Sequence, residues 1–186
     1  MLRYRVVLVL LAVCTILFDA PPVFADLDFS QYYTMPVAAS RNKTDDVEKM
    51  LIAGRRPDDT DDSGQCPLGY AASFGNAEMA RILLKYNAPP NQRDRFGNTP
   101  LHWAADRGAV DIMQMLIDAK ATVDAQNRQG MTPLMMAANK GQVLAVRFLL
   151  RHGADPKKQD YTGRDALGWA EGKPNVLQQL RAARAN

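Results

Sequence analysis

The chain has 186 residues, of which 47% are hydrophobic and 23% are charged. This composition is typical of one soluble domain and argues against a disordered or membrane-embedded chain. The formal net charge is +3, and it falls to +2 when positions 1–25 are left out. Such a small positive excess is too weak for a nucleic-acid-binding protein.

The start of the chain, positions 1–25, has the features of a secretory signal peptide. Arg3 and Arg5 precede an apolar run at residues 6–18, and residues 23–25 (Val-Phe-Ala) place small or modest side chains where a signal peptidase reads. A membrane anchor is the alternative, but the 13 residues of the run, at ~1.5 Å each in a helix, reach only about 20 Å of the ~30 Å hydrocarbon core. We therefore predict a signal peptide over residues 1–25, removed by cleavage at its end.

Residues 26–186 carry a 33-residue repeat. Glycines, prolines and leucines recur at this spacing: Gly64, Gly97, Gly130 and Gly163; Pro67, Pro100 and Pro133; and Leu68, Leu101, Leu134 and Leu167. A fixed period of this length is the signature of a stacked repeat architecture. We place the copies at residues 28–60, 61–93, 94–126, 127–159 and, incompletely, 160–186.

The copy at residues 94–126 shows the unit that each repeat is expected to form. Thr99 can cap a helix through its hydroxyl while Pro100 fills the first helical position, where no amide hydrogen is needed. The helix then runs to Gly108, a residue suited to a left-handed C-terminal turn. Residues 110–119 follow with apolar side chains at helical spacing. Each unit is therefore predicted to be a turn followed by two antiparallel helices.

Two motifs carry a resemblance to a known family. Residues 99–108 read Thr-Pro-Leu-His-x-Ala-Ala-x-x-Gly and residues 149–155 read Leu-Leu-x-x-Gly-Ala-Asp, and through both the chain resembles the ankyrin-repeat family. The resemblance implies an all-α fold, a solenoid of about five 33-residue helix-turn-helix units joined by β-hairpin-like turns. It also implies that His102 makes a hydrogen bond that ties adjacent hairpins together.

The end copies and one turn depart from this pattern. The first copy lacks the Thr-Pro-Leu sequence, and the last breaks off before a full second helix and hairpin, as expected of caps. Pro174 stands at the position of Gly108, so we expect the last copy to end irregularly. Lys120 stands where the first and fourth copies have Gly54 and Gly153. Because a left-handed turn strains a lysine, we expect local distortion there.

Few residues in the chain could support catalysis. The only histidines are His102 and His152, and neither accompanies a nucleophile motif, a phosphate-binding glycine loop, a Cys-x-x-Cys pair or a His-Glu-x-x-His element. We therefore predict a protein that is not an enzyme and needs no cofactor. Cys66 is the only cysteine after the leader, so no internal disulfide is expected. We expect a half-buried small residue there, with a reactive thiol or a dimer link as the alternative.

Residues 59–64 match the first half of a calcium-binding loop, with Asp59 and Asp61 at its first two ligand positions. The second half does not match. The position that requires a bidentate glutamate is Tyr70, and Pro67 starts a helix inside the loop. We therefore expect a solvated acidic hairpin and no metal site.

In ankyrin-repeat proteins the hairpin tips and the outer side of the first helix line a concave surface that recognises partners. The resemblance implies partner-binding residues at the matching positions of this chain. They are Phe74, Arg95, Phe96, Asn98, Asp106, Arg107, Arg128, Gln129, Met131, Asn139, Lys140, Tyr161 and Arg164, together with Asp62, Ser63, Gln65, Ser73 and Thr162.

Four of these residues, Phe74, Phe96, Met131 and Tyr161, are apolar where solubility alone favours polar side chains. Aromatic and arginine side chains are typical binding anchors. The alternative is that the four side chains pack across the hairpins and stabilise the stack. We expect the best anchors on the third and fourth copies.

We predict a monomeric, non-catalytic module in the periplasm of a Gram-negative bacterium that binds a protein partner through the concave surface. One alternative is an effector secreted onward to bind a host protein, and another is a calcium-dependent or membrane-surface structural protein. Residues 26–92 have 7 Lys and Arg against 10 Asp and Glu, whereas residues 93–186 have 14 against 9. The basic second part could favour an acidic protein surface or anionic lipid heads, although solvated charge is the default interpretation.

Overall fold

The computed structural model describes residues 33–185, and the compact unit that contains all its helices begins at Thr34. The predicted signal peptide and its cleavage site lie outside the described residues. Within residues 33–185 the chain forms ten helices and no strand, so the predicted all-α fold of paired helices is confirmed, and no helix there is long and apolar enough to cross a membrane. The helices are α2 (Met35–Ser40), α3 (Thr44–Ile52), α4 (Pro67–Phe74), α5 (Ala77–Lys85), α6 (Pro100–Arg107), α7 (Val110–Asp118), α8 (Pro133–Lys140), α9 (Val143–Arg151), α10 (Ala166–Trp169) and α11 (Pro174–Ala185).

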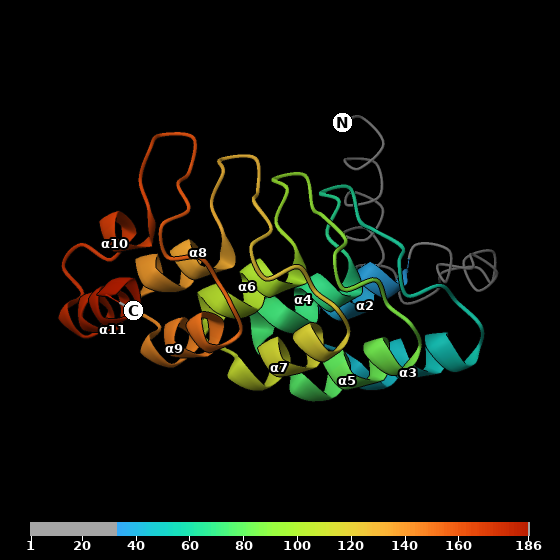
Figure 1. Cartoon of the computed structure of the whole chain (residues 1–186). Coiled ribbons are helices and arrows are strands. Elements are labelled where there is room, and N and C mark those ends of the chain that lie inside the picture. Colours follow the sequence, from blue (N-terminus) through green and yellow to red (C-terminus); the bar gives the residue numbers. More distant parts are fainter. Residues whose placement is uncertain (1–32, 186) are drawn as a thin grey trace, which may run out of the picture. The chain divides into compact units, whose positions relative to one another are not determined.

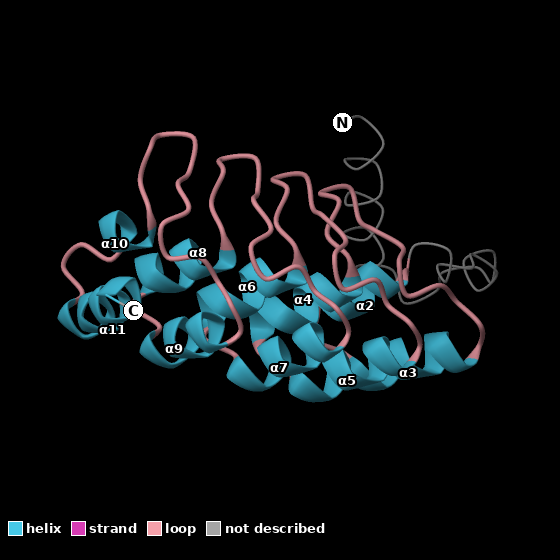
Figure 2. Cartoon of the chain, in the orientation of Figure 1, coloured by secondary structure: helices cyan, strands magenta, loops and turns pink. Residues whose placement is uncertain are grey.

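The helices form two rows (Figure 1). The even-numbered helices, α2 to α10, are the first helices of the copies, and the odd-numbered helices, α3 to α11, are the second helices. Each helix packs against the other helix of its own copy and against its counterpart in the neighbouring copy. Long loops project to one side of the first helices (Figure 2). We call the turns at residues 61–65, 94–98, 127–131 and 160–164 hairpins 2 to 5, and the surface that they form with the exposed side of the first helices the hairpin face.

Local chemistry sets the bounds of the central first helices. α4, α6 and α8 each begin at a proline, which needs no amide hydrogen at this position, and each is followed by a glycine with φ between 72° and 78°. The residue before the proline supplies the cap. Thr132 Oγ1 accepts a hydrogen bond from the Met135 amide at 3.3 Å, and Cys66 Sγ accepts one from the Gly69 amide at the same distance. The predicted start of α6 at Pro100 is therefore confirmed.

One core runs between the two rows of helices. Leu68, Leu101 and Leu134 occupy the same position in three copies and have no exposed surface. The first helices pack closely because their inner faces carry small residues such as Ala104 and Ala105, which are also buried. A single copy has no core of its own, so stability depends on the stacking of neighbouring copies.

The turn after α7 contains a lysine in a left-handed conformation. Lys120 has a φ of 69°. The hydrogen bond that closes this turn, from the Ala121 amide to the Leu116 carbonyl, is 2.8 Å long, and the matching bond from Ala88 to Leu83 is 3.0 Å. The expected local distortion is therefore wrong. The backbone hydrogen bond preserves the turn, and the strain remains in the dihedral angle of Lys120.

The last copy shortens a different helix from the one expected. α10 has four residues, whereas α11 has 12, more than the nine of α9. The prediction that this copy lacks a full second helix is therefore wrong. Pro174 stands where earlier copies have a left-handed glycine, and the ring of a proline holds its φ negative. The left-handed turn lies instead at Gly172, with a φ of 75°, and Pro174 begins α11.

Candidate protein-binding surface

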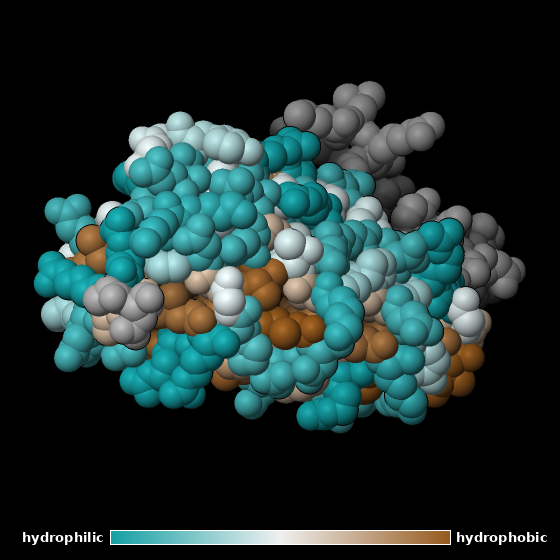
Figure 3. Space-filling view, in the orientation of Figure 1, coloured by the Kyte–Doolittle hydropathy of each residue, from teal (hydrophilic) through white to brown (hydrophobic). Residues whose placement is uncertain are grey.

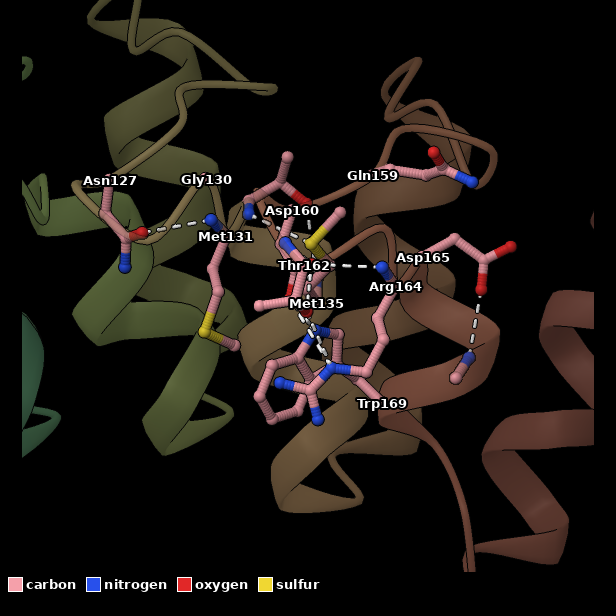
Figure 4. Close-up of polar contacts among 12 residues, drawn as sticks. Asn127, Gly130, Met131, Met135, Gln159, Asp160, Thr162, Arg164, Asp165 and Trp169 are labelled. Atoms are coloured by element: carbon pink, nitrogen blue, oxygen red, sulfur yellow. Dashed lines mark hydrogen bonds and ion pairs between the residues drawn. The ribbon is translucent and has the colours of Figure 1, made fainter.

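An aspartate or asparagine anchors the base of each hairpin. In hairpin 3, Asp94 Oδ1 accepts hydrogen bonds from the amides of Phe96 at 2.8 Å and Asn98 at 2.9 Å. The other three hairpins repeat this pair of bonds at 2.8–3.0 Å. Figure 4 shows the bond from Met131 to Asn127 in hairpin 4 and the contacts of Asp160 in hairpin 5. The anchors are Asp61, Asp94, Asn127 and Asp160, which follow the 33-residue spacing of the repeat.

Three of these anchors receive a further hydrogen bond from an aromatic side chain nine residues later. Trp103 Nε1 donates to Asp94 Oδ2 at 3.2 Å. Each ring is therefore tied by its polar atom to the base of its own hairpin. The other two pairs are the Tyr70 hydroxyl with Asp61 Oδ2, and Trp169 Nε1 with Asp160 Oδ2 at 2.9 Å.

Hairpin 4 is anchored differently because it lacks such a ring. The residue nine positions after its anchor is Met136, which has no N–H or O–H to donate. The anchor there is Asn127, whose Nδ2 donates to Asn98 Oδ1 in hairpin 3 at 2.8 Å. The anchor is thus an aspartate where an aromatic side chain of the same copy donates to its Oδ2, and an asparagine where the copy has no such donor.

Backbone contacts join neighbouring hairpins into one surface. The Arg128 amide donates to the Phe96 carbonyl at 2.9 Å, and equivalent bonds of 3.1 Å join hairpins 2 and 3 and hairpins 4 and 5. The contact leaves no room for a side chain at Gly130, where a Cβ would lie 2.7 Å from the Tyr161 amide nitrogen. The hairpins therefore hold fixed positions relative to one another.

His102 adds a side-chain link between copies. The Thr99 amide donates to His102 Nδ1 at 3.1 Å, so Nδ1 is an acceptor and the ring proton is on Nε2. Nε2 then donates to the Met131 carbonyl in hairpin 4 at 3.0 Å. The link implied by the family resemblance is therefore present. Burial lowers the pKa of His102 to about 4, so the ring is neutral at pH 7.

The structure places most of the predicted partner-binding residues on the hairpin face. The aromatic members Phe74, Phe96 and Tyr161 are 42%, 46% and 72% exposed. The Tyr161 ring also packs against Gly130 of hairpin 4, where a Cβ would lie 2.8 Å from its Cδ1, so contact across the hairpins leaves much of each aromatic residue exposed. The exposed polar and charged members are Arg95, Arg107, Arg128, Gln129, Asn139, Lys140 and Arg164, and the partly buried ones are Asp106 and Met131.

Two of the predicted residues, Gln65 and Asn98, are each only 7% exposed. Asn98 makes its hydrogen bonds within the fold. Its Nδ2 donates to Asp94 Oδ2 at 3.4 Å, and its Oδ1 accepts the bond from Asn127. Both polar atoms are thus used within the fold. Asn98 joins two hairpins instead of presenting a contact to a partner.

Arg164 is partly engaged by its own hairpin (Figure 4). Its guanidinium carbon lies 3.6 Å from the centre of the Trp169 ring, and its Nε donates to Thr162 Oγ1 at 3.1 Å and lies 3.7 Å from Asp160 Oδ2. Burial acts to raise the pKa of Asp160, but hydrogen bonds from Thr162, Arg164 and Trp169 outweigh it and lower this pKa to about 2. The Trp169 ring is therefore covered by a side chain of its own copy.

Two aromatic residues of the surface were missed by the sequence reasoning. Tyr70 and Trp103 line a pocket of about 240 Å³ between hairpins 2 and 3, together with Arg95 and Phe96. The signal was available in the repeat frame. Positions 70, 103, 136 and 169 are equivalent in the 33-residue frame and carry an aromatic residue in three of the four copies.

Cys66 is a structural residue. It is buried and caps α4, and burial raises the pKa of its thiol to about 11. A buried, protonated thiol is a poor nucleophile and cannot reach a second chain. The structure therefore favours the small buried residue over the reactive thiol and the dimer link.

The acidic hairpin uses its central carboxylate internally. Asp61 Oδ1 accepts hydrogen bonds from the amides of Ser63 at 2.8 Å and Gln65 at 3.0 Å, and Oδ2 accepts one from the Tyr70 hydroxyl. These bonds compete with a cation for the same oxygens and weigh against the calcium alternative. Within residues 33–185, no group of three or more His, Cys, Asp or Glu side chains is placed to hold a metal ion.

The surface around the hairpins is mostly hydrophilic. In Figure 3, hydrophilic residues cover the hairpins, and apolar residues gather in a band below them. The exposed rings of Phe96 and Tyr161 are exceptions to this pattern on the hairpins. The basic side chains of the face lie in the part of the chain where Lys and Arg outnumber Asp and Glu by 14 to 9, residues 93–186.

Comparison with known families agrees with this architecture. Residues 36–127 and 119–186 match the family model described as "Ankyrin repeats (3 copies)". The chain belongs to the ankyrin-repeat family. A search of curated protein sequences found no match to it. Proteins built from ankyrin repeats are generally protein–protein interaction modules and are typically non-catalytic.

Proposed function

We propose that this protein is a non-catalytic module of the periplasm of a Gram-negative bacterium, and that it binds a partner protein on the hairpin face. The observation that carries the proposal is the exposure of Phe96 at the centre of a rigid surface. The residue is 46% exposed, and the guanidinium carbon of Arg95 lies 4.9 Å from the centre of its ring. Aromatic and arginine side chains at the centre of a surface are typical hot spots of binding.

The fold does not require a phenylalanine at this position. The other copies have Ser63, Gln129 and Thr162 there, and all of them form the same hairpin. The pairing of this exposed ring with Arg95 supports the proposal, because aromatic and arginine side chains are typical binding anchors. The Arg128 amide is bonded to the Phe96 carbonyl, so anchors on hairpins 3 and 4 form one patch.

Export is proposed from the sequence of positions 1–25. Two arginines, an apolar run and a Val-Phe-Ala sequence follow in the order expected of a cleaved signal peptide. N-terminal sequencing of the protein from a periplasmic fraction tests this. The expected product begins at Asp26, and a product that begins at Met1 or remains with the membranes would contradict export with cleavage.

Affinity capture from the periplasm of the source bacterium tests the binding surface. We expect Phe96→Ala with Arg128→Ala to lose the captured partner while the melting temperature stays nearly unchanged. The matched control is Leu144→Ala with Arg151→Ala on α9, which removes one exposed apolar and one exposed arginine side chain away from the hairpins. If the hairpin variant captures the partner as well as the control does, the surface is assigned wrongly.

A further inference from the structure

The pocket between hairpins 2 and 3 has the size of a site for a single side chain. Its volume is about 240 Å³, below the ~300–1,000 Å³ typical of small-molecule sites. Three aromatic residues, Tyr70, Phe96 and Trp103, contribute to its walls, and Ser63 and Ser73 add hydroxyl groups. The residues come from two copies, so the pocket exists only in the stacked protein.

The two deeper rings are held in place before any partner binds. The Tyr70 hydroxyl donates to Asp61, and Trp103 Nε1 donates to Asp94 Oδ2 at 3.2 Å. Because the polar atom of each ring already has its partner in the hairpin base, the rest of the ring is available as apolar surface. A wall that is fixed in advance lowers the ordering cost of binding.

The Trp103 ring lacks the internal cover that the last copy provides. There, Arg164 lies over the equivalent Trp169 at 3.6 Å (Figure 4). In the copy that contains Trp103, the residue equivalent to Arg164 is Asn98. Its short side chain is hydrogen-bonded to Asp94 and Asn127. The ring of Trp103 therefore remains open to a group from outside.

The charges around the pocket favour an acidic ligand. Arg95 stands over Phe96 at its edge, and Arg107 lies against Gly75 at the end of α4, where a Cβ would be 3.6 Å from its Cγ. The Asp94 carboxylate in the wall accepts hydrogen bonds from the amides of Phe96 and Asn98 and from two side chains, so its charge is offset within the fold. Asp62 of hairpin 2 is exposed as well, so the positive charge lies on the hairpin 3 side of the pocket, at Arg95 and Arg107.

We propose that this pocket receives one apolar side chain, of the size of leucine or phenylalanine, from an extended acidic segment of the partner protein. Carboxylates of that segment pair with Arg95, Arg107 and Arg128 while the apolar side chain rests on Tyr70 and Trp103. The inference rests on the proposed protein-binding function and adds the chemistry of the partner. Charge complementarity of this kind sets the orientation and speeds the encounter.

Fluorescence anisotropy with labelled peptides tests the proposal on the protein purified from cells that export it. The probe is a short peptide with one phenylalanine followed by a run of glutamates. One control peptide replaces the phenylalanine with alanine, and the other replaces the glutamates with lysines. We expect both controls to bind about tenfold more weakly or worse, since each removes one of the two required interactions. Equal binding of all three peptides would overturn the proposal.

Three variants locate the binding of the probe. Phe96→Ala removes one wall of the pocket, and Arg95→Glu reverses a charge at its rim. Ser73→Leu fills the pocket and leaves Phe96 and Arg95 unchanged. Each should weaken binding about tenfold or more, and Leu144→Ala on α9 should not. Thermal melts confirm that the variants are folded, and Ser73→Leu keeps the test valid if another variant is not.

Failure of this inference can be distinguished from failure of the proposed function. If the partner is lost from Phe96→Ala with Arg128→Ala but retained by Ser73→Leu, the hairpin face binds the partner and the pocket does not. Ser73→Leu could abolish binding of the acidic peptide while the hairpin variants still capture the partner. In that case the pocket binds acidic peptides, and the partner binds at another surface. Unchanged peptide binding in all three variants refutes the pocket.

Discussion

The side-chain nitrogen of Asn127 lies 2.8 Å from the side-chain oxygen of Asn98 and joins hairpins 3 and 4 through one buried hydrogen bond. An aspartate at position 127 would face that oxygen with a carboxylate and no hydrogen between them. We expect Asn127→Asp to lower the free energy of unfolding by about 1–3 kcal/mol, the usual cost of a buried polar group without a partner. Denaturant titration measures the loss, and Asn139→Asp, the same change at an exposed position, should cost far less. Equal losses would show that the bond does not stabilise the hairpins.

A second prediction concerns the pH dependence of stability. The pKa of His102 is about 4 in the folded protein, below its ordinary value of 6.5. The neutral His102 ring therefore contributes its full stabilisation of the fold above pH 6.5. This stabilisation is lost as the pH falls toward 4, because between these pH values the histidine takes up a proton in the unfolded chain but not in the folded protein. Between pH 7 and pH 4.5 this residue should remove about 2–3 kcal/mol of stability.

Denaturant titrations at the two pH values measure that loss. His102→Gln should lack this part of the pH dependence, whereas His152→Gln, on the exposed end of α9, should keep it. If His102→Gln loses as much stability on acidification as the unmodified protein does, His102 is not the group responsible.

Lys120 gives a prediction of higher stability. Its φ of 69° is unfavourable for a residue with a Cβ. Lys120→Gly should raise the free energy of unfolding by about 0.5–1 kcal/mol, since the relief of strain exceeds the extra entropy of glycine in the unfolded chain. Lys120→Ala removes the same charge but keeps the Cβ, so it should give no such gain. A gain of the same size in both variants would assign the effect to the lysine charge and not to the backbone.

The core and the surface should respond differently to truncation. Leu101→Ala leaves a cavity in the central copy, where both neighbouring copies pack on the residue, and should cost about 2–5 kcal/mol. Arg128→Ala removes an exposed side chain and should cost less than about 0.5 kcal/mol. Comparable midpoints for the two variants in denaturant would contradict the assignment of core and surface.

Millimolar calcium should leave the melting temperature unchanged. The oxygens of Asp61 already accept hydrogen bonds from Ser63, Gln65 and Tyr70. A ligand at 100 times its dissociation constant would add about 2.7 kcal/mol, which a thermal melt detects easily. Magnesium at the same concentration controls for ionic strength. A rise of several degrees with calcium alone would restore the calcium alternative.

Elements that depend on neighbouring residues within one copy could be predicted from the sequence. Thr99 and Pro100 identify the start of α6, and the left-handed Gly108 identifies its end, because capping and backbone preference act over a few residues. The 33-residue period then placed the equivalent helices of the other central copies. It also placed the exposed rings of Phe96 and Tyr161 on one surface, since both lie in hairpins, and the hairpins of a stacked repeat project from the same side.

Features that depend on the neighbouring copy could be seen only in the folded protein. Asn98 and Met131 hold the same position in the repeat, yet Asn98 is buried by its bond to Asn127 while Met131 is only partly buried. Arg164, at that position in the last copy, covers Trp169, whereas Trp103 faces an open pocket. The repeat period identifies equivalent positions along the chain. The side chains that contact those positions from the neighbouring copy differ, and these contacts determine the burial, the charge and the shape of the pocket.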